Sequence, residues 1–158
     1  MTPQVLTTRS PWPRLAIVAA WAIAFAVVEA MIVYYLRKLF ALEYATVFTE
    51  RTFHFPQKYL LEEQGREAAT MVMLLTVGLL AGRTLWQAFA YWIFAFGVWD
   101  IFYYVWLRVL LGWPSSLGTR DLLFLIPNEW WGPVWLPTSI SVGFIVAAVL
   151  ILRFTRRP

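Results

Sequence analysis

The hydrophobic positions of the chain form long runs that polar segments separate. The runs cover about residues 15–36, 67–82, 85–107 and 133–154. A helix of roughly 20 apolar residues crosses a hydrocarbon layer about 30 Å thick, and the chain lacks the alternating pattern of barrel strands. The pattern predicts an all-α polytopic membrane protein, a bundle of four transmembrane helices that forms a single domain over residues 1–158.

The connections between these predicted helices differ in character. Only residues 82–84 join the second helix to the third. The polar stretch 38–66 separates the first two, and Pro56 is placed to begin a helix that runs on into the second. The connection 112–132 is rich in Trp, Pro and Gly, and we expect an interfacial loop with a short re-entrant or amphipathic piece.

Composition supports the membrane class and narrows the chemistry. Of the 158 residues 61% are hydrophobic and 14% are charged, whereas a soluble domain has roughly 45–50% and about 25%. The absence of Cys excludes disulfides, thiolate nucleophiles and thiolate-bound metals. The single histidine, His54, excludes bis-histidine haem ligation and a histidine metal triad within one chain. We expect no cofactor and no dedicated metal centre.

The formal charge of +4 does not indicate nucleic-acid binding, because the basic residues sit at the ends of apolar runs. We expect the lipid bilayer as the partner instead. Four crossings put both termini on one side of the membrane, which carries Arg9, Arg14, Arg83, Arg153, Arg156 and Arg157 and no acid. The count of Lys and Arg on the two sides does not decide the orientation. We predict that this side is the cytoplasm because arginines cluster directly beside the first and last helices.

An offset of 71 residues superimposes the first half of the chain on the second. It pairs Trp21 with Trp92, Glu29 with Asp100 and Arg37 with Arg108. We predict an internal repeat, residues 21–83 and 92–154, which would make two parallel helical hairpins as in parallel-repeat transporters. The alternative is that two aromatic-rich helices simply look alike.

The paired acids lie at similar depth in helices that run in the same direction. A charged carboxylate in lipid costs about 2.5 kcal/mol or more, so Glu29 and Asp100 are predicted to face inward and to meet. Small residues beside them allow close packing on those faces. These are Ala22, Ala26, Ala30 and Gly97.

A third acid, Glu67, opens the second run near the same level, and Glu63 can pair with Arg66 one turn away. We predict an oxygen-rich pocket for a proton or a hard cation; the alternative is a purely structural set of buried hydrogen bonds. The predicted binding residues are Glu29, Asp100, Glu67, Tyr34 and Tyr104, supported by Arg37, Arg108, Tyr103 and Glu63.

Four tryptophans recur every seven residues, at Trp92, Trp99, Trp106 and Trp113. Such a stripe drifts only about 20° per heptad around a helix. We interpret it as a packing surface for a neighbouring helix or subunit, with a groove for a pigment, quinone or sterol as the alternative.

The segments Phe96–Arg108, Gly-Trp-Pro-Ser-Ser-Leu at 112–117 and Asp-Leu-Leu-Phe-Leu-Ile-Pro at 121–127 resemble a group of bacterial multi-pass membrane proteins. Residues 33–37 and 66–75 are similar to that group as well. The resemblance implies a bacterial inner-membrane location and implies no activity.

Two functional hypotheses remain open. The first is a membrane protein that binds a proton or cation at the acid cluster, for transport or coupling, with a homodimer or larger membrane complex as its assembly. The second is a non-catalytic accessory subunit of such a complex. An intramembrane enzyme is least favoured, because the sequence offers no recognisable pair of nucleophile and base.

Overall fold

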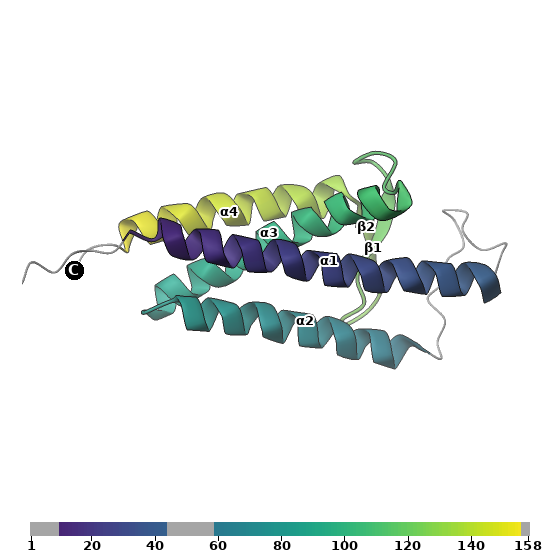
Figure 1. The fold of residues 1–158 in the computed structure, drawn as a ribbon, viewed down its shortest axis with the longest axis horizontal. Coiled ribbons are helices and arrows are strands. Elements are labelled where there is room, and N and C mark those ends of the chain that lie inside the picture. Colours follow the sequence, from purple (N-terminus) through teal and green to yellow (C-terminus); the bar gives the residue numbers. More distant parts are fainter. Residues whose placement is uncertain (1–9, 44–58, 156–158) are drawn as a thin grey trace, which may run out of the picture.

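The computed structural model describes residues 10–43 and 59–155, with side chains for 10–38 and 59–155. The described residues form four helices and one small antiparallel sheet (Figure 1). His54, Pro56 and their neighbours lie outside the described residues. The elements are α1 (Trp12–Glu43), α2 (Leu60–Ala81), α3 (Leu85–Leu111), β1 (Arg120–Phe124), β2 (Trp130–Pro133) and α4 (Trp135–Phe154).

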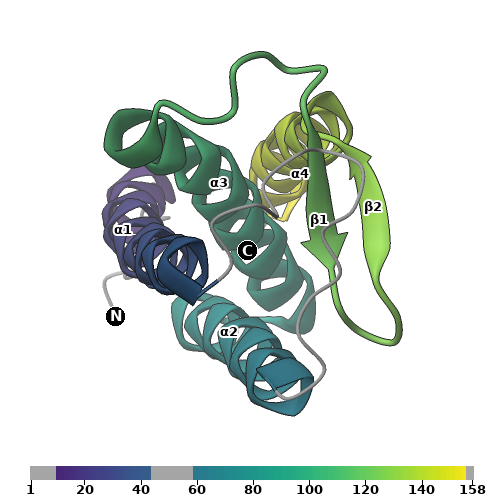
Figure 2. The same ribbon diagram turned by 90° about the vertical axis from the view of Figure 1, so that its right-hand side faces the viewer.

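Helix α3 is the centre of the bundle. It packs against α1, α2 and α4, whereas α1 and α2 make little direct contact with each other. Figure 2 shows α3 surrounded by the other helices, with the β1–β2 hairpin beside α4. At the end of the bundle where α1 begins, Arg14 donates to the carbonyl oxygen of Ala81 at 3.2 Å and Gln87 donates to that of Thr155 at 3.3 Å. The starts of α1 and α3 and the ends of α2 and α4 therefore lie together.

Three of these helices are long and apolar enough to cross a membrane. They are Trp12–Lys38, Leu85–Leu111 and Trp135–Phe154, and this supports the membrane class that the sequence predicts. Helix α2 is not among them, because its first two turns carry Glu62, Glu63, Arg66 and Glu67. A bundle of four membrane-crossing helices remains a prediction.

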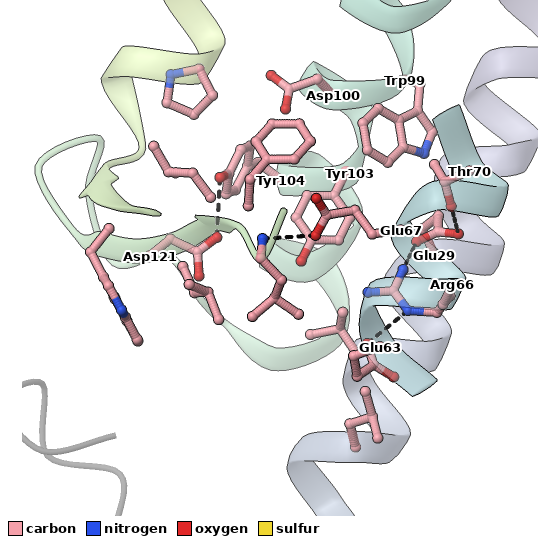
Figure 3. Close-up of a pocket in the computed structure, with 18 of the residues that line it drawn as sticks. Glu29, Glu63, Arg66, Glu67, Thr70, Trp99, Asp100, Tyr103, Tyr104 and Asp121 are labelled. Atoms are coloured by element: carbon pink, nitrogen blue, oxygen red, sulfur yellow. Dashed lines mark hydrogen bonds and ion pairs between the residues drawn. The ribbon is translucent and has the colours of Figure 1, made fainter. Parts of the chain in front are cut away.

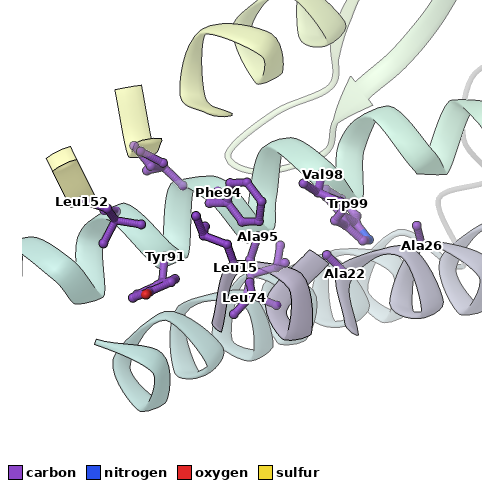
Figure 4. Close-up of a cluster of buried hydrophobic side chains, with 14 residues drawn as sticks. Leu15, Ala22, Ala26, Leu74, Tyr91, Phe94, Ala95, Val98, Trp99 and Leu152 are labelled. Carbon is purple, nitrogen blue, oxygen red and sulfur yellow. The ribbon is translucent and has the colours of Figure 1, made fainter. Parts of the chain in front are cut away.

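Small residues bring the helix backbones together, and the apolar side chains fill the space around them (Figure 4). Ala22, Ala26 and Ala30 are all 0% exposed. On α2, a Cβ placed on Gly78 would lie 2.6 Å from the Cβ of Trp92 on α3. On α3, a Cβ placed on Gly97 would lie 2.6 Å from the carbonyl oxygen of Ser141 on α4. At both glycines, therefore, α3 and a neighbouring helix lie too close together for a larger side chain.

The connection between α3 and α4 folds as a β-hairpin, where the sequence predicts an interfacial loop with a re-entrant or amphipathic piece. Arg120 pairs with Pro133, Asp121 with Gly132 and Leu122 with Trp131, and a register shift separates Leu122 from Phe124. A short apolar run on each side of a Pro-Asn pair gives two strands that satisfy each other's backbone groups. The hairpin lies at the end of the bundle where α3 ends and α4 begins.

The two predicted helical hairpins do not pack alike. Helices α3 and α4 are in extensive contact along their length, and α1 and α2 are not. At the level of helix packing, the internal repeat remains a prediction.

We expect Gly78→Ala to lower the stability of the protein by about 1–3 kcal/mol, because its methyl group would force α2 away from Trp92. Gly143→Ala is the matched control, since nothing lies within 4 Å of a Cβ placed at that helical position. Thermal unfolding in mild detergent measures both. Equal midpoints for the two variants would contradict this account of the α2–α3 contact.

Candidate functional site

A cavity of about 400 Å³ lies between α1, α2, α3 and the hairpin (Figure 3). Its wall combines charged groups with aliphatic and aromatic side chains. Five carboxylates and three guanidiniums contribute to it, so the lining carries an excess of acid. The carboxylates are Glu29, Glu63, Glu67, Asp100 and Asp121, and the guanidiniums are Arg37, Arg66 and Arg120.

On one side of the cavity a buried acid is neutralised. Glu29 is 3% exposed, forms an ion pair with Arg66 of α2 and accepts a hydrogen bond from the hydroxyl of Thr70 at 2.8 Å. Arg66 also donates to Glu63 at 2.8 Å, one turn earlier in α2. A buried charge is tolerated when it is both paired and hydrogen-bonded, and Glu29 meets both conditions.

On the other side a second buried acid has no cation against it. Asp100 is 7% exposed, and its Oδ2 accepts a hydrogen bond from the Ser141 hydroxyl of α4 at 2.8 Å. Among the described residues no ion pair reaches Asp100. Asp100 and Glu29 thus line one cavity. They bind different partners, whereas the sequence predicts that they meet.

Asp121 of β1 is the second acid on this side. Its Oδ2 accepts a hydrogen bond from the hydroxyl of Tyr104, at 3.1 Å. Burial raises the pKa of Asp121 to about 6, although the Arg37 guanidinium and the Tyr104 hydrogen bond act in the opposite direction. Asp121 therefore titrates within reach of neutral pH.

Glu67 ties the hairpin to α2. Its carboxylate accepts hydrogen bonds from the backbone N–H groups of Leu125 at 2.9 Å and Ile126 at 3.4 Å. Gln64, one turn earlier, donates to the carbonyl oxygen of Leu125 at 3.2 Å. The sequence leaves Glu67 without a partner, whereas in the structure it holds the segment that follows β1.

Two residues of the predicted cluster do not line the cavity. The stripe of α1 that does so is Glu29, Val33, Leu36 and Arg37. Tyr34 is turned to another side of that helix, where its ring contacts Tyr35 and Lys38. Arg108 donates to the carbonyl oxygens of Gly112 and Pro114 and so caps the end of α3.

The tryptophans of the heptad stripe contact several elements. Trp92 packs against Gly78 of α2, Trp99 stacks on Phe25 of α1, and Trp106 donates to the carbonyl oxygen of Ile23 at 3.3 Å. Trp113 lies beneath the guanidinium of Arg37, 3.9 Å from the ring centroid.

Two indole nitrogens, those of Trp92 and Trp99, are buried without a hydrogen-bond partner among the described residues. Only Trp99 and Trp113 of the stripe line the cavity.

Sequence reasoning missed four members of the site. The sequence predicts that Arg66 pairs within its own helix, but in the structure it also forms an ion pair with Glu29 of α1. Asp121 carries no signal of its own in a loop, and Thr70 and Ser141 are ordinary hydroxyls in apolar helices. Each hydroxyl lies on the helix that follows the helix of its acid in the chain. A search of the next apolar run for polar residues would have found both.

No three acidic or histidine side chains within the described part of the chain gather closely enough to hold a metal ion. Comparison of the chain with family models, with curated proteins and with solved structures finds no match. The function must therefore be argued from the geometry of the cavity.

We expect Arg66→Gln to destabilise the protein by about 3 kcal/mol, because it leaves the buried carboxylate of Glu29 without a cation. The double variant Glu29→Gln/Arg66→Gln should regain most of this loss. Arg108→Gln is the control, because that guanidinium is exposed and contacts only carbonyl groups. Unfolding in a denaturing detergent titration measures all three. A double variant as unstable as Arg66→Gln would show that the ion pair is not the cause.

The raised pKa of Asp121 makes stability depend on pH. Since the folded pKa of about 6 lies above the ordinary value of 3.8, the folded state binds more protons between these values, and stability falls as the pH rises from about 4 to above 6. Asp121→Asn should remove up to about 3 kcal/mol of this dependence. Thermal midpoints recorded across this pH range test it, and an unchanged slope in the variant would refute it.

Proposed function

We propose that this protein binds a proton or a cation at the buried carboxylate of Asp100, as a step in transport or coupling across a bacterial inner membrane. The observation that carries the proposal is the unequal compensation of two similar acids. Glu29 has an arginine, and Asp100 has only the hydroxyl of Ser141. A buried carboxylate without a cation is unstable until it takes up a proton or a positively charged ligand.

The predicted internal repeat explains how such an asymmetry could arise. Glu29 and Asp100 are 71 residues apart, and so are the hydroxyl residues bound to them, Thr70 and Ser141. Each acid therefore accepts a hydrogen bond from a hydroxyl at the same distance along the chain. These matched contacts support the repeat.

One position breaks this correspondence. The residue 71 positions after Arg66 is Pro137, which also lines the cavity. The second half keeps the acid and its hydroxyl but has no guanidinium at that position. We infer that the first site is the structural one and that the second is free to exchange its ligand.

The proton affinity of Asp100 depends on the charges that share the cavity with it. Tyr103 and Tyr104 come from its own helix, and α4 contributes only the neutral hydroxyl of Ser141. The charged groups are Glu29 and Arg37 of α1, Glu63, Arg66 and Glu67 of α2, and Arg120 and Asp121 of β1. Arg66 pairs with Glu29 and Glu63, and Arg37 stacks on Trp113. Neither guanidinium forms an ion pair with Asp100.

The proposal includes an orientation of the bundle in the membrane. If α2 also crosses the membrane, the end of the bundle with Arg14, Arg83 and Arg153 faces the cytoplasm, with both termini there. The cavity and the hairpin then lie toward the outer side. An aqueous path from that side to Asp100 would be short, whereas the packed core of Figure 4 separates it from the cytoplasm.

We expect Asp100→Asn to abolish proton flux into proteoliposomes driven by a potassium diffusion potential, a loss of at least tenfold. The amide keeps the size of the side chain and can still bond Ser141, but it cannot carry a proton. Glu62→Gln is the control, since it removes an exposed acid of α2, and it should retain the flux within about twofold. Glu29→Gln should also retain flux if the protein remains folded.

Flux that survives in Asp100→Asn would contradict the proposal. A wild-type protein with no flux above empty liposomes would contradict transport. If it also purified from native membranes with stoichiometric partner chains, the accessory-subunit hypothesis would be favoured.

A further inference from the structure

We propose that a groove between α1 and α2 binds one anionic phospholipid of the bilayer, with an acyl chain between the two helices and the phosphate at the guanidinium of Arg14. The groove lies at the end of the bundle where α1 begins, and it shares no residue with the acid-lined cavity. This inference depends on the membrane class of the protein and makes no use of Asp100.

The groove is an apolar hollow between two neighbouring helices. Its volume is about 300 Å³, and Figures 1 and 2 show α1 and α2 side by side. Val18 is buried, whereas Ile17 and Leu80 are exposed, so the hollow opens to the outside of the bundle. From Arg14 to Trp21 it follows α1 for about 10 Å, at 1.5 Å per residue. The apolar residues of the lining are Ile17, Val18 and Trp21 of α1 and Val77, Leu80 and Ala81 of α2.

A hydrocarbon chain is the occupant that this hollow favours in a membrane. Helices α1 and α2 make little direct contact, so the side chains along the groove lack the neighbours that close packing would give them. An empty space forfeits those dispersion contacts, and water needs polar partners that an apolar wall does not offer. An acyl chain would supply the missing packing between α1 and α2.

Arg14 stands at the mouth of the groove and reaches across it. The guanidinium donates to the carbonyl oxygen of Ala81 at 3.2 Å, which joins the start of α1 to the end of α2. Arg14 belongs to the first turn of a candidate membrane span, where a crossing helix meets the lipid headgroups. A guanidinium has five N–H donors, and among the described residues no carboxylate pairs with this one. The remaining donors can bind phosphate oxygens.

The charge at this end of the bundle selects an anionic lipid. Residues 10–21, 74–91 and 148–155 form this end and contain no Asp or Glu, whereas Arg14, Arg83 and Arg153 all lie there. Basic pockets between membrane-crossing helices bind anionic headgroups. The ammonium of a zwitterionic lipid would find no carboxylate here, and it would lie among like charges.

Native mass spectrometry of the full chain in mild detergent tests the choice of lipid. The two probes are dioleoylphosphatidylglycerol and dioleoylphosphatidylcholine, which share both acyl chains and the phosphate and differ in net charge. We expect the first phosphatidylglycerol molecule to bind at least fivefold more tightly than phosphatidylcholine.

Variants then locate the lipid. Arg14→Gln should abolish the preference for phosphatidylglycerol, and Arg153→Gln is its control, because that guanidinium lies over Trp12 and does not line the groove. Val77→Phe leaves Arg14 in place and fills the groove, so it should weaken phosphatidylglycerol binding at least threefold. Val146→Phe makes the same change at an exposed position of α4 and should leave binding within twofold of the wild type. Each pair tests the site even if a variant of the other pair folds poorly.

Equal affinity for the two lipids would overturn this inference. An equal loss in Arg14→Gln and Arg153→Gln would overturn it as well, because attraction to a basic surface would then be sufficient. Unchanged binding in Val77→Phe would show that the chain does not lie in the groove. A dimer that forms without lipid and dissociates in Val77→Phe would assign the groove to a second copy of the chain and would refute the lipid site.

Discussion

The ion pair between Glu29 and Arg66 is the contact on which the arrangement of the first two helices depends. Helices α1 and α2 scarcely touch through their apolar faces, so the guanidinium of Arg66 and the hydroxyl of Thr70 bring α2 to the acid of α1. The interaction is strong because its alternative is a bare carboxylate inside an apolar bundle. Because α2 is fixed there, Glu67 and Gln64 in turn hold the segment after β1 over the cavity.

The same physical constraint gives the opposite outcome on the other side of the cavity. Asp100 is almost as buried as Glu29, but Pro137 stands where a matching arginine would be needed. A protein that required only structural acids would gain nothing from leaving this charge uncompensated. The cost of the bare carboxylate is offset when a proton or a cation occupies the site, and it returns when the ligand leaves. That alternation is the physical basis of the function we propose.

Much of the fold follows from the hydrophobic pattern. The predicted runs at 15–36, 85–107 and 133–154 correspond to α1, α3 and α4. Helices α1 and α3 continue past the predicted ends, and α4 begins at Trp135, slightly later than predicted. The run at 67–82 covers only the apolar part of α2. The sequence also predicts that a helix precedes this run and continues into it, and α2 begins at Leu60 with two polar turns that tertiary contacts hold. The hairpin was missed, since short apolar runs do not by themselves distinguish strands from loops.

The sequence predicts only part of the candidate site. Glu29 and Asp100 stand out because a charge in an apolar run is rare, and the depth argument places both in one cavity. The partners of these two acids could not be inferred. Whether an acid of one helix meets Arg66, a hydroxyl or another acid depends on which helices are adjacent, and the sequence does not give that. Tyr34 was assigned to the site by proximity along the chain, but the helical twist directs it elsewhere.

The central claim is that the cavity contains one compensated carboxylate and one that exchanges a proton. Solid-state NMR of the protein in lipid bilayers, with ¹³C-labelled Asp and Glu carboxyl groups assigned through Asp100→Asn and Glu29→Gln, tests it most directly. The account predicts that the Asp100 signal changes between carboxylic acid and carboxylate within the pH range over which the protein stays folded. An Asp100 signal that stays a carboxylate throughout would contradict it.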